Sequence, residues 1–140
     1  MPIPQTRRLT LLWLLAFGFG VAGGVALAAP TDYRFEPTSP TIERGGGVAL
    51  RIEVRERAQN RLVPNVEFRD ARVDRSTDGM PNAVLPAFFE PSLDYGVYRF
   101  RADLPTDGNW TLNFTALIPG EPQPVGASVT FKVVGPRARP

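Results

Sequence analysis

Apolar and polar residues alternate in short runs along most of the chain beyond residue 32. In the most regular run, residues 48–56, four aliphatic side chains (Val48, Leu50, Ile52 and Val54) alternate with charged or small ones. A period of two places one set of side chains in a core and the other in solvent, which is typical of a half-buried β-strand. The same reasoning predicts seven strands, at residues 33–36, 48–56, 66–74, 84–89, 96–102, 110–118 and 125–134.

Three local features refine this pattern. The apolar phase shifts between Phe68 and Ala71, which indicates a β-bulge. Pro86 interrupts the run at 84–89, and because proline cannot donate to a strand ladder, this run is expected to be a short edge strand at best. Gly108 is the fourth residue of a Pro-Thr-Asp-Gly-Asn sequence at 105–109, which predicts a tight turn with a positive φ at the glycine.

The composition favours an all-β chain. Many of the chain's 15 prolines and 13 glycines separate the strand-like runs, and residues 29–134 show no helical period. We therefore predict an immunoglobulin-like β-sandwich of about seven strands over residues 29–134, followed by a frayed tail at 135–140. The predicted core consists of Val48, Leu50, Ile52, Val54, Val66, Phe68, Val73, Tyr98, Phe100, Trp110, Leu112, Phe114, Val129, Phe131 and Val133.

Residues 94–98 have the Asp-x-Gly-x-Tyr spacing of a tyrosine corner, with Tyr98 as the tyrosine. In that motif the phenol hydroxyl bonds back to the backbone upstream, and the strand that follows is normally the penultimate one of the sandwich. Two predicted strands follow residues 96–102, however. An ordinary turn followed by a strand tyrosine is therefore the second interpretation, and both favour a sandwich.

The chain opens with a targeting pattern. Residues 1–8 end in two arginines, residues 9–25 are almost wholly apolar, and residues 26–28 (Ala-Leu-Ala) form a small-x-small cleavage site. Cleavage after residue 28, the favoured interpretation, would remove residues 1–28 as a signal peptide. The alternative is an uncleaved anchor helix, since the apolar run at 9–29 has 21 residues and is about long enough to span a bilayer. Both interpretations predict an exported, periplasmic domain, and the second anchors it to the inner membrane.

Charge and composition narrow the possible chemistry. The two arginines before the apolar run account for the formal net charge of +2, so the exported part is neutral. Its arginines alternate with glutamates instead of clustering, which argues against nucleic-acid binding. The chain has no Cys and no His, and this excludes disulfides, thiolate or imidazole catalysis and the usual zinc sites. We expect no enzyme and no cofactor.

Two segments resemble the YtkA-like/FixH-like family of small exported bacterial domains. Residues 61–66 (Arg-Leu-Val-Pro-Asn-Val), which close the segment 48–68, are similar to that family's G-x-P-V-x-x-A-x-V linker. Residues 96–112 are similar to its G-x-Y-x-x-x-x-x-L-P-x-x-G-x-W-x-L core. The resemblance covers residues 32–134. It implies a sandwich fold and an association with copper handling, either beside metal-efflux systems or as a membrane-anchored helper in oxidase assembly.

Met80 is the one candidate metal ligand. Metal-linked members of the family tend to carry Met and sometimes His in the segment that corresponds to residues 74–82, where this chain has only Asp-Gly-Met. A copper(I) site needs several soft ligands, so one thioether is insufficient alone. Met80 would then be one ligand of a site completed by a partner chain, or, as we favour, a loop methionine covering the edge of the core.

The function expected from these observations is a non-catalytic periplasmic accessory or binding domain that acts through protein contacts. By resemblance, its partner would be a metal-efflux or oxidase-assembly component of the cell envelope. A direct copper carrier and a plain structural module of the envelope are the alternatives.

Overall fold

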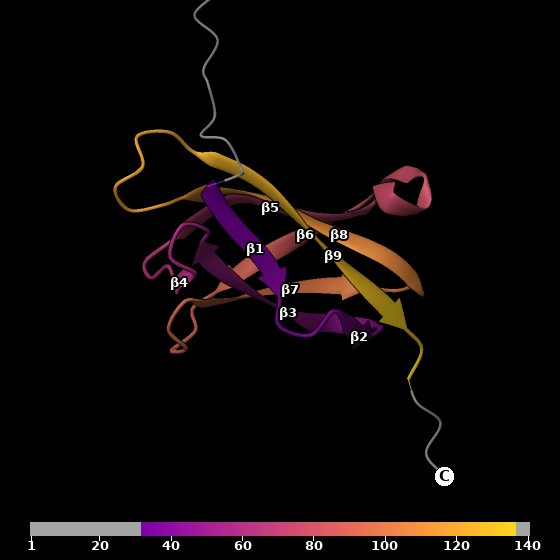
Figure 1. Cartoon of the computed structure of the whole chain (residues 1–140). Coiled ribbons are helices and arrows are strands. Elements are labelled where there is room, and N and C mark those ends of the chain that lie inside the picture. Colours follow the sequence, from indigo (N-terminus) through magenta and orange to yellow (C-terminus); the bar gives the residue numbers. More distant parts are fainter. Residues whose placement is uncertain (1–31, 137–140) are drawn as a thin grey trace, which may run out of the picture.

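The computed structural model describes residues 32–136, which form nine β-strands and a short 3₁₀ helix, η2 (Figure 1). The predicted targeting segment and most of the predicted tail lie outside these residues. Within residues 32–136, no helix has the length and apolar character needed to cross a membrane. The elements are β1 (Tyr33–Pro37), β2 (Thr41–Glu43), β3 (Gly45–Glu56), β4 (Arg61–Leu62), β5 (Glu67–Arg75), η2 (Ser76–Asp78), β6 (Met80–Glu90), β7 (Val97–Leu104), β8 (Gly108–Leu117) and β9 (Val125–Val134).

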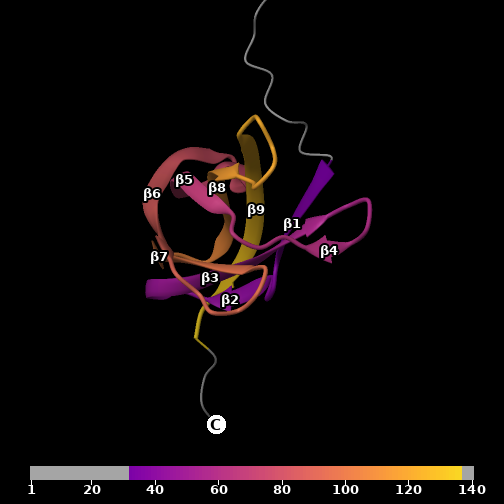
Figure 2. The same ribbon diagram turned by 90° about the vertical axis from the view of Figure 1, so that its left-hand side faces the viewer.

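The strands form one curled sheet in the order β1-β3-β7-β6-β5-β8-β9-β2, and β4 pairs separately with β3. Seen along the strands, the sheet folds over itself into two layers around a common core, so the fold is a β-sandwich (Figure 2). One layer contains β1, β3, β4 and β7, and the other contains β5, β8, β9 and β2. All pairings are antiparallel except that of β2 with β9.

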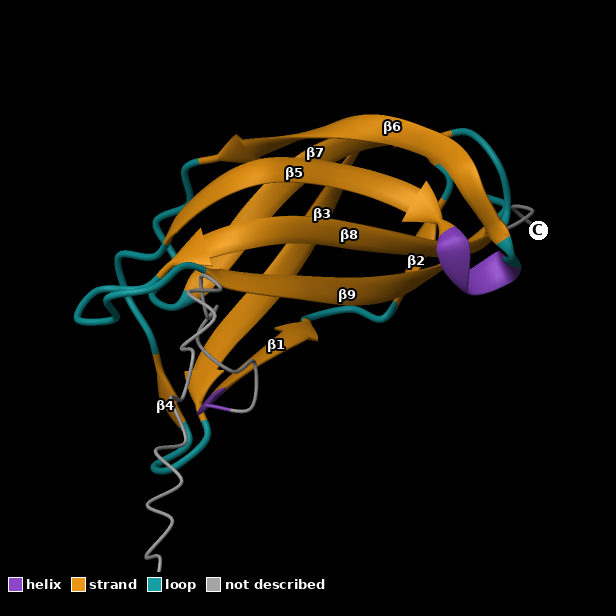
Figure 3. Ribbon diagram, turned by 90° about the horizontal axis from the view of Figure 1, so that it is seen from above, coloured by secondary structure: helices purple, strands orange, loops and turns teal. Residues whose placement is uncertain are grey.

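β6 belongs to both layers. The prediction of a short edge strand at 84–89 was therefore wrong. The strand extends from Met80 to Glu90; its first part pairs with β5 and its last part with β7 (Figure 3). Pro86 is the last residue in register with β5, and Ala87 is the first in register with β7. Proline is therefore tolerated because it lies where the strand changes partner, not in the middle of a two-sided ladder.

The structure has nine strands where about seven were predicted. The two additional strands, β2 and β4, have three and two residues, too few to show a period of two. β2 follows β1 after a short link and pairs with the opposite layer, so the first part of the chain passes from one layer to the other. The predicted bulge is confirmed, since the register of β5 against β8 shifts between Arg69 and Arg72 and Asp70 has a φ of 55°.

The predicted core is confirmed. Thirteen of its fifteen residues are buried, and Val48 and Phe68 are partly buried and pack against the others. Phe68 on β5 is the centre of an aromatic cluster that spans the two layers. Its ring centroid lies 4.9 Å from Tyr98, 5.0 Å from Phe100, 5.1 Å from Phe114 and 5.5 Å from Phe89.

The β7–β8 turn is fixed by its glycine and by a carboxylate, as the sequence predicts in part. Gly108 has a φ of 129°, and a Cβ there would overlap the side chains of Arg75 and Asp78. Asp78 accepts hydrogen bonds from the backbone and side-chain nitrogens of Asn109, both at 2.8 Å, and from Arg75 at 2.9 Å. These bonds hold the pKa of Asp78 below its usual range, and the bonds from Asn109 contribute most to this shift.

Trp110 follows this turn and anchors the core at that end. It is 3% exposed, and its indole nitrogen donates to the carbonyl oxygen of Thr106 at 2.9 Å. Replacement Trp110→Ala should lower the free energy of unfolding by about 3–5 kcal/mol, the usual loss for a large buried aromatic residue. Chemical denaturation measures this change, with Lys132→Ala on the exposed face of the neighbouring strand β9 as the control. A loss below about 1 kcal/mol is a surface effect and would contradict the placement of Trp110.

Candidate functional site

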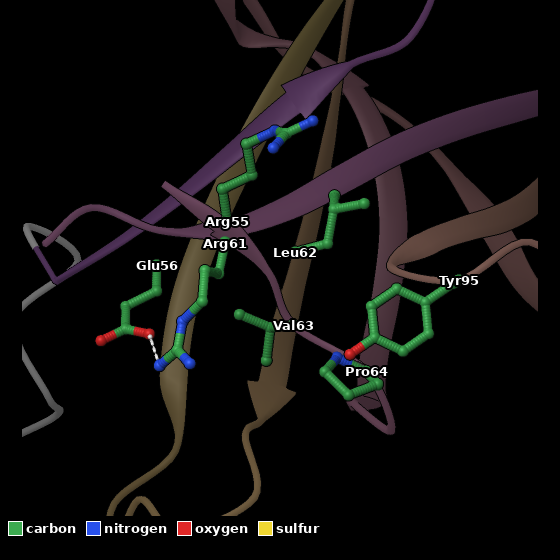
Figure 4. Close-up of a pocket in the computed structure, with 7 residues that line it drawn as sticks. All are labelled: Arg55, Glu56, Arg61, Leu62, Val63, Pro64 and Tyr95. Atoms are coloured by element: carbon green, nitrogen blue, oxygen red, sulfur yellow. Dashed lines mark hydrogen bonds and ion pairs between the residues drawn. The ribbon is translucent and has the colours of Figure 1, made fainter. Parts of the chain in front are cut away.

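The loops at one end of the sandwich enclose an open groove around Tyr95. We call this end, where β1 begins, the Tyr33 end; it lies on the left of Figure 1 and faces the viewer in Figure 2. One hollow of about 540 Å³ lies between the β3–β4 hairpin, the loop after β4 and the β6–β7 loop (Figure 4). Its lining residues are Arg55, Glu56, Arg61, Leu62, Val63, Pro64 and Tyr95. A second hollow of about 340 Å³ shares Pro64 and Tyr95 and extends to Phe89 and Leu93.

A glycine allows the β6–β7 loop to pack closely against β4. Gly96 is buried with a φ of 70°, and a Cβ at this position would lie 2.6 Å from the Cβ of Leu62. Its carbonyl oxygen accepts a hydrogen bond from the backbone nitrogen of Val54 at 3.2 Å. Only glycine combines this conformation with so close a contact, so the base of the loop is fixed.

Tyr98 fixes the opposite wall. Its hydroxyl donates to the carbonyl oxygen of Val63 at 2.6 Å and accepts from the backbone nitrogen of Val66 at 3.0 Å. Burial raises the pKa of this phenol. The tyrosine-corner interpretation is thus correct in that the hydroxyl bonds to upstream backbone. The acceptor and donor lie 35 and 32 residues upstream, in the loop before β5. The strand of Tyr98 is not the penultimate one that the motif normally precedes, because β8 and β9 both follow β7.

The charged side chains of the groove form ion pairs, and one of the partners, Glu53, lies outside its lining. Arg61 lies 3.2 Å from Glu56, and Arg55 lies 3.2 Å from Glu53 and donates to the carbonyl oxygen of Asn60. Such exposed pairs add little stability, but they leave this wall close to neutral. The groove therefore offers apolar surface, one phenol and paired ions, an arrangement suited to binding an apolar or aromatic group.

Met80 lies far from this groove, at the opposite end of β6. It is the first residue of that strand, not part of a loop as predicted, and it is 50% exposed. Two carboxylates of the adjoining segment already accept hydrogen bonds within the chain. Asp78 accepts them from Asn109 and Arg75, and Asp74 accepts them from Ser76 and Asn113. Over residues 32–136, no three His, Cys, Asp or Glu side chains are grouped so that they could hold a metal ion.

Sequence reasoning missed a concentration of exposed apolar side chains. Within residues 32–136, every large apolar side chain that is exposed belongs to β6 or to the loop after it. The β6 strip, as we name it, comprises Met80, Val84 and Phe88, and the loop adds Leu93 and Tyr95. Phe89, although 41% exposed, follows Phe88 on the strand, points to its other face and packs against Phe68. The spacing of Val84 and Phe88 by four residues was the available signal, since positions an even number apart share one face of a strand, whereas Met80 lies beyond a register shift of β6 against β5.

Comparison with known proteins identifies no family. No sequence-family model and no curated protein matches the chain. Among solved structures, the ZirS C-terminal domain is similar, with a TM-score of 0.43 and 10% identity over 96% of this chain and 82% of that one. An endo-beta-1,4-mannanase from Thermotoga petrophila has a TM-score of 0.36 and 18% identity over 74% of this chain and 20% of the enzyme. These similarities are too low to support a functional argument, and the resemblance to the YtkA-like/FixH-like family stays a prediction.

The hydroxyl of Tyr98 offers a direct test of how the groove is built. Tyr98→Phe should lower the free energy of unfolding by about 1–3 kcal/mol, because it leaves the amide of Val66 and the carbonyl of Val63 without their partner. Tyr95→Phe is the matched control, since the Tyr95 side chain is 66% exposed and its change should be close to zero. Equal losses in thermal or chemical unfolding would contradict this role for Tyr98.

We also predict that the isolated domain, residues 29–140, does not bind copper tightly. Copper(I) prefers thiolate and thioether ligands, and copper(II) prefers imidazole. Of these groups, residues 29–140 contain only the thioether of Met80. Titration with copper(I) against a competing chelator measures the affinity. Stoichiometric binding in the nanomolar range that disappears in Met80→Leu would favour the copper-carrier alternative instead.

Proposed function

We propose that this protein is a non-catalytic accessory domain of the cell envelope that binds a protein partner through the β6 strip. The observation that carries the proposal is the concentration of all large exposed apolar side chains of residues 32–136 in the segment 80–95. Monomeric soluble proteins seldom expose large apolar patches, and such a patch commonly marks an interaction site.

The surroundings of the strip support a protein contact. Phe88, 63% exposed, lies beside Arg101 in the β6–β7 register. The Arg101 guanidinium donates to both oxygens of Glu90, at 2.5 and 3.3 Å, and Arg99 lies 3.0 Å from the same carboxylate. An apolar centre bordered by polar and charged groups is the usual composition of a protein interface.

The finer fold assignment that we propose is an immunoglobulin-like sandwich. The order β1-β3-β7-β6 in one layer and β5-β8-β9 in the other corresponds to the A-B-E-D and C-F-G sheets of that fold. The passage of the first strand from one layer to the other supports the same assignment. Because this fold serves many functions, the assignment supports an interaction module without specifying its partner.

The partner class comes from the sequence resemblance. It points to a metal-efflux or oxidase-assembly component, with the domain held on the periplasmic side. In the copper-carrier alternative, Met80 would receive further soft ligands from the partner. In the structural-module alternative, the β6 strip would have no specific partner.

Site-specific photo-crosslinking in cells tests the proposal. A photo-reactive phenylalanine analogue in place of Phe88 should yield a covalent adduct with a cell-envelope protein, identified by mass spectrometry. The same analogue in place of Thr130, which is exposed on the opposite layer, is the control and should yield no such adduct.

A second substitution makes the result specific to the strip. Val84→Asp places a charge on the same face of β6 as Phe88, four residues away within the strip, and should abolish the adduct, because a charge inside an apolar contact must be desolvated. Adducts of equal yield from positions 88 and 130, or no adduct from either, would favour the structural-module alternative.

A further inference from the structure

The Tyr33 end of the sandwich adjoins the apolar N-terminal run. Tyr33 is the first residue of β1, and only Pro30, Thr31 and Asp32 separate it from the run at 9–29. Strand register places the β3–β4 hairpin and the β6–β7 loop at this same end, because Tyr33 pairs with Glu56 and Val97 pairs with Glu53. Figure 2 looks directly onto this end.

The short link limits how far the domain can lie from a bilayer that holds residues 9–29. Four Cα–Cα steps join Ala29 to Tyr33, so these two residues are at most about 14 Å apart. The headgroup layer on one side of a bilayer is about 5–8 Å thick. The Tyr33 end would therefore be held at the headgroup surface, within reach of its loops.

The β6–β7 loop has the side chains that such a position favours. Leu93 is 105% exposed and Tyr95 is 66% exposed. The loop holds them outward on a fixed base, because Gly96 packs against Leu62 and a backbone bond joins Val97 to Asp94 at 3.2 Å. Leucine inserts into the apolar boundary of a bilayer, and tyrosine is enriched at the headgroup level.

We propose that Leu93 and Tyr95 contact the outer surface of the membrane in which residues 9–29 are retained as an anchor. This inference rests on the proposed envelope function and favours the anchor over cleavage after residue 28. Each side chain alone would bind a bilayer weakly, but the tether supplies the high local concentration that makes a weak contact persist. The two arginines at positions 7 and 8 orient the anchor with the domain on the side away from the cytoplasm.

The contact also sets the direction of the β6 strip. β6 ends at the Tyr33 end and begins at the opposite end of the sandwich, so Phe88 would lie near the bilayer and Met80 far from it. The strip would then run away from the membrane surface, in position to pack against the exported part of a neighbouring membrane protein.

Labelling of single cysteines in the full chain tests this inference, and the chain has no cysteine of its own. Leu93→Cys carries an environment-sensitive fluorophore, and the full protein is reconstituted into phosphatidylcholine vesicles that contain a brominated lipid. We expect a blue-shifted emission and strong quenching by the brominated lipid. Asp107→Cys, in the turn at the opposite end, is the matched control and should show neither.

The outcomes separate this inference from the proposed function. Equal quenching at positions 93 and 107, or an exported protein that starts at residue 29 by mass spectrometry, would overturn the membrane contact. A label at position 93 that responds only when a partner protein is added would also overturn it, and would assign the loop to the protein interface. An adduct at Phe88 together with a water-exposed label at position 93 would support the proposed function and contradict the membrane contact. A membrane-inserted label at position 93 without any adduct at Phe88 would support the membrane contact and contradict the proposed protein interface.

Discussion

The rest of the structure depends on the packing of Phe68 between the two layers. A sandwich of this size often has a disulfide at its centre, and this chain has no cysteine. The ring of Phe68 on β5 contacts Tyr98 and Phe100 on β7 and Phe114 on β8, mostly edge to face. Aromatic pairs of this geometry add about 0.5–1.5 kcal/mol each beyond the area that they bury. The cluster thus holds together layers that no disulfide joins.

The aromatic cluster also determines the shape of the groove. Tyr98 contributes its ring to the cluster and its hydroxyl to the loop before β5, so one residue connects the core to the wall of the groove. On the other side, Gly96 brings the β6–β7 loop against Leu62. Leu93 and Tyr95 project from a loop whose base is fixed, and binding there would require little ordering of the chain.

Regular alternation made most of the fold predictable, and its absence accounts for the errors. Residues 48–56, 110–118 and 125–134 alternate strictly, and β3, β8 and β9 occupy these positions. β2 and β4 are defined by partners distant in the sequence, which no local pattern reveals. Pro86 argued for an edge strand because sequence cannot show that β6 changes partner there. The groove around Tyr95 was missed for a similar reason, since it forms from three segments that meet only in the folded chain.

Because β6 pairs with β5 in one layer and with β7 in the other, the sandwich has a backbone seam along that side. Pulling the layers apart there breaks main-chain hydrogen bonds in addition to side-chain packing. The opposite side, where β1 and β2 lie at the two ends of the strand order, is closed by the link between these strands and by the bond from Tyr33 to Glu121. The molecule is therefore mechanically asymmetric, and a load applied to β6 is shared directly by both layers.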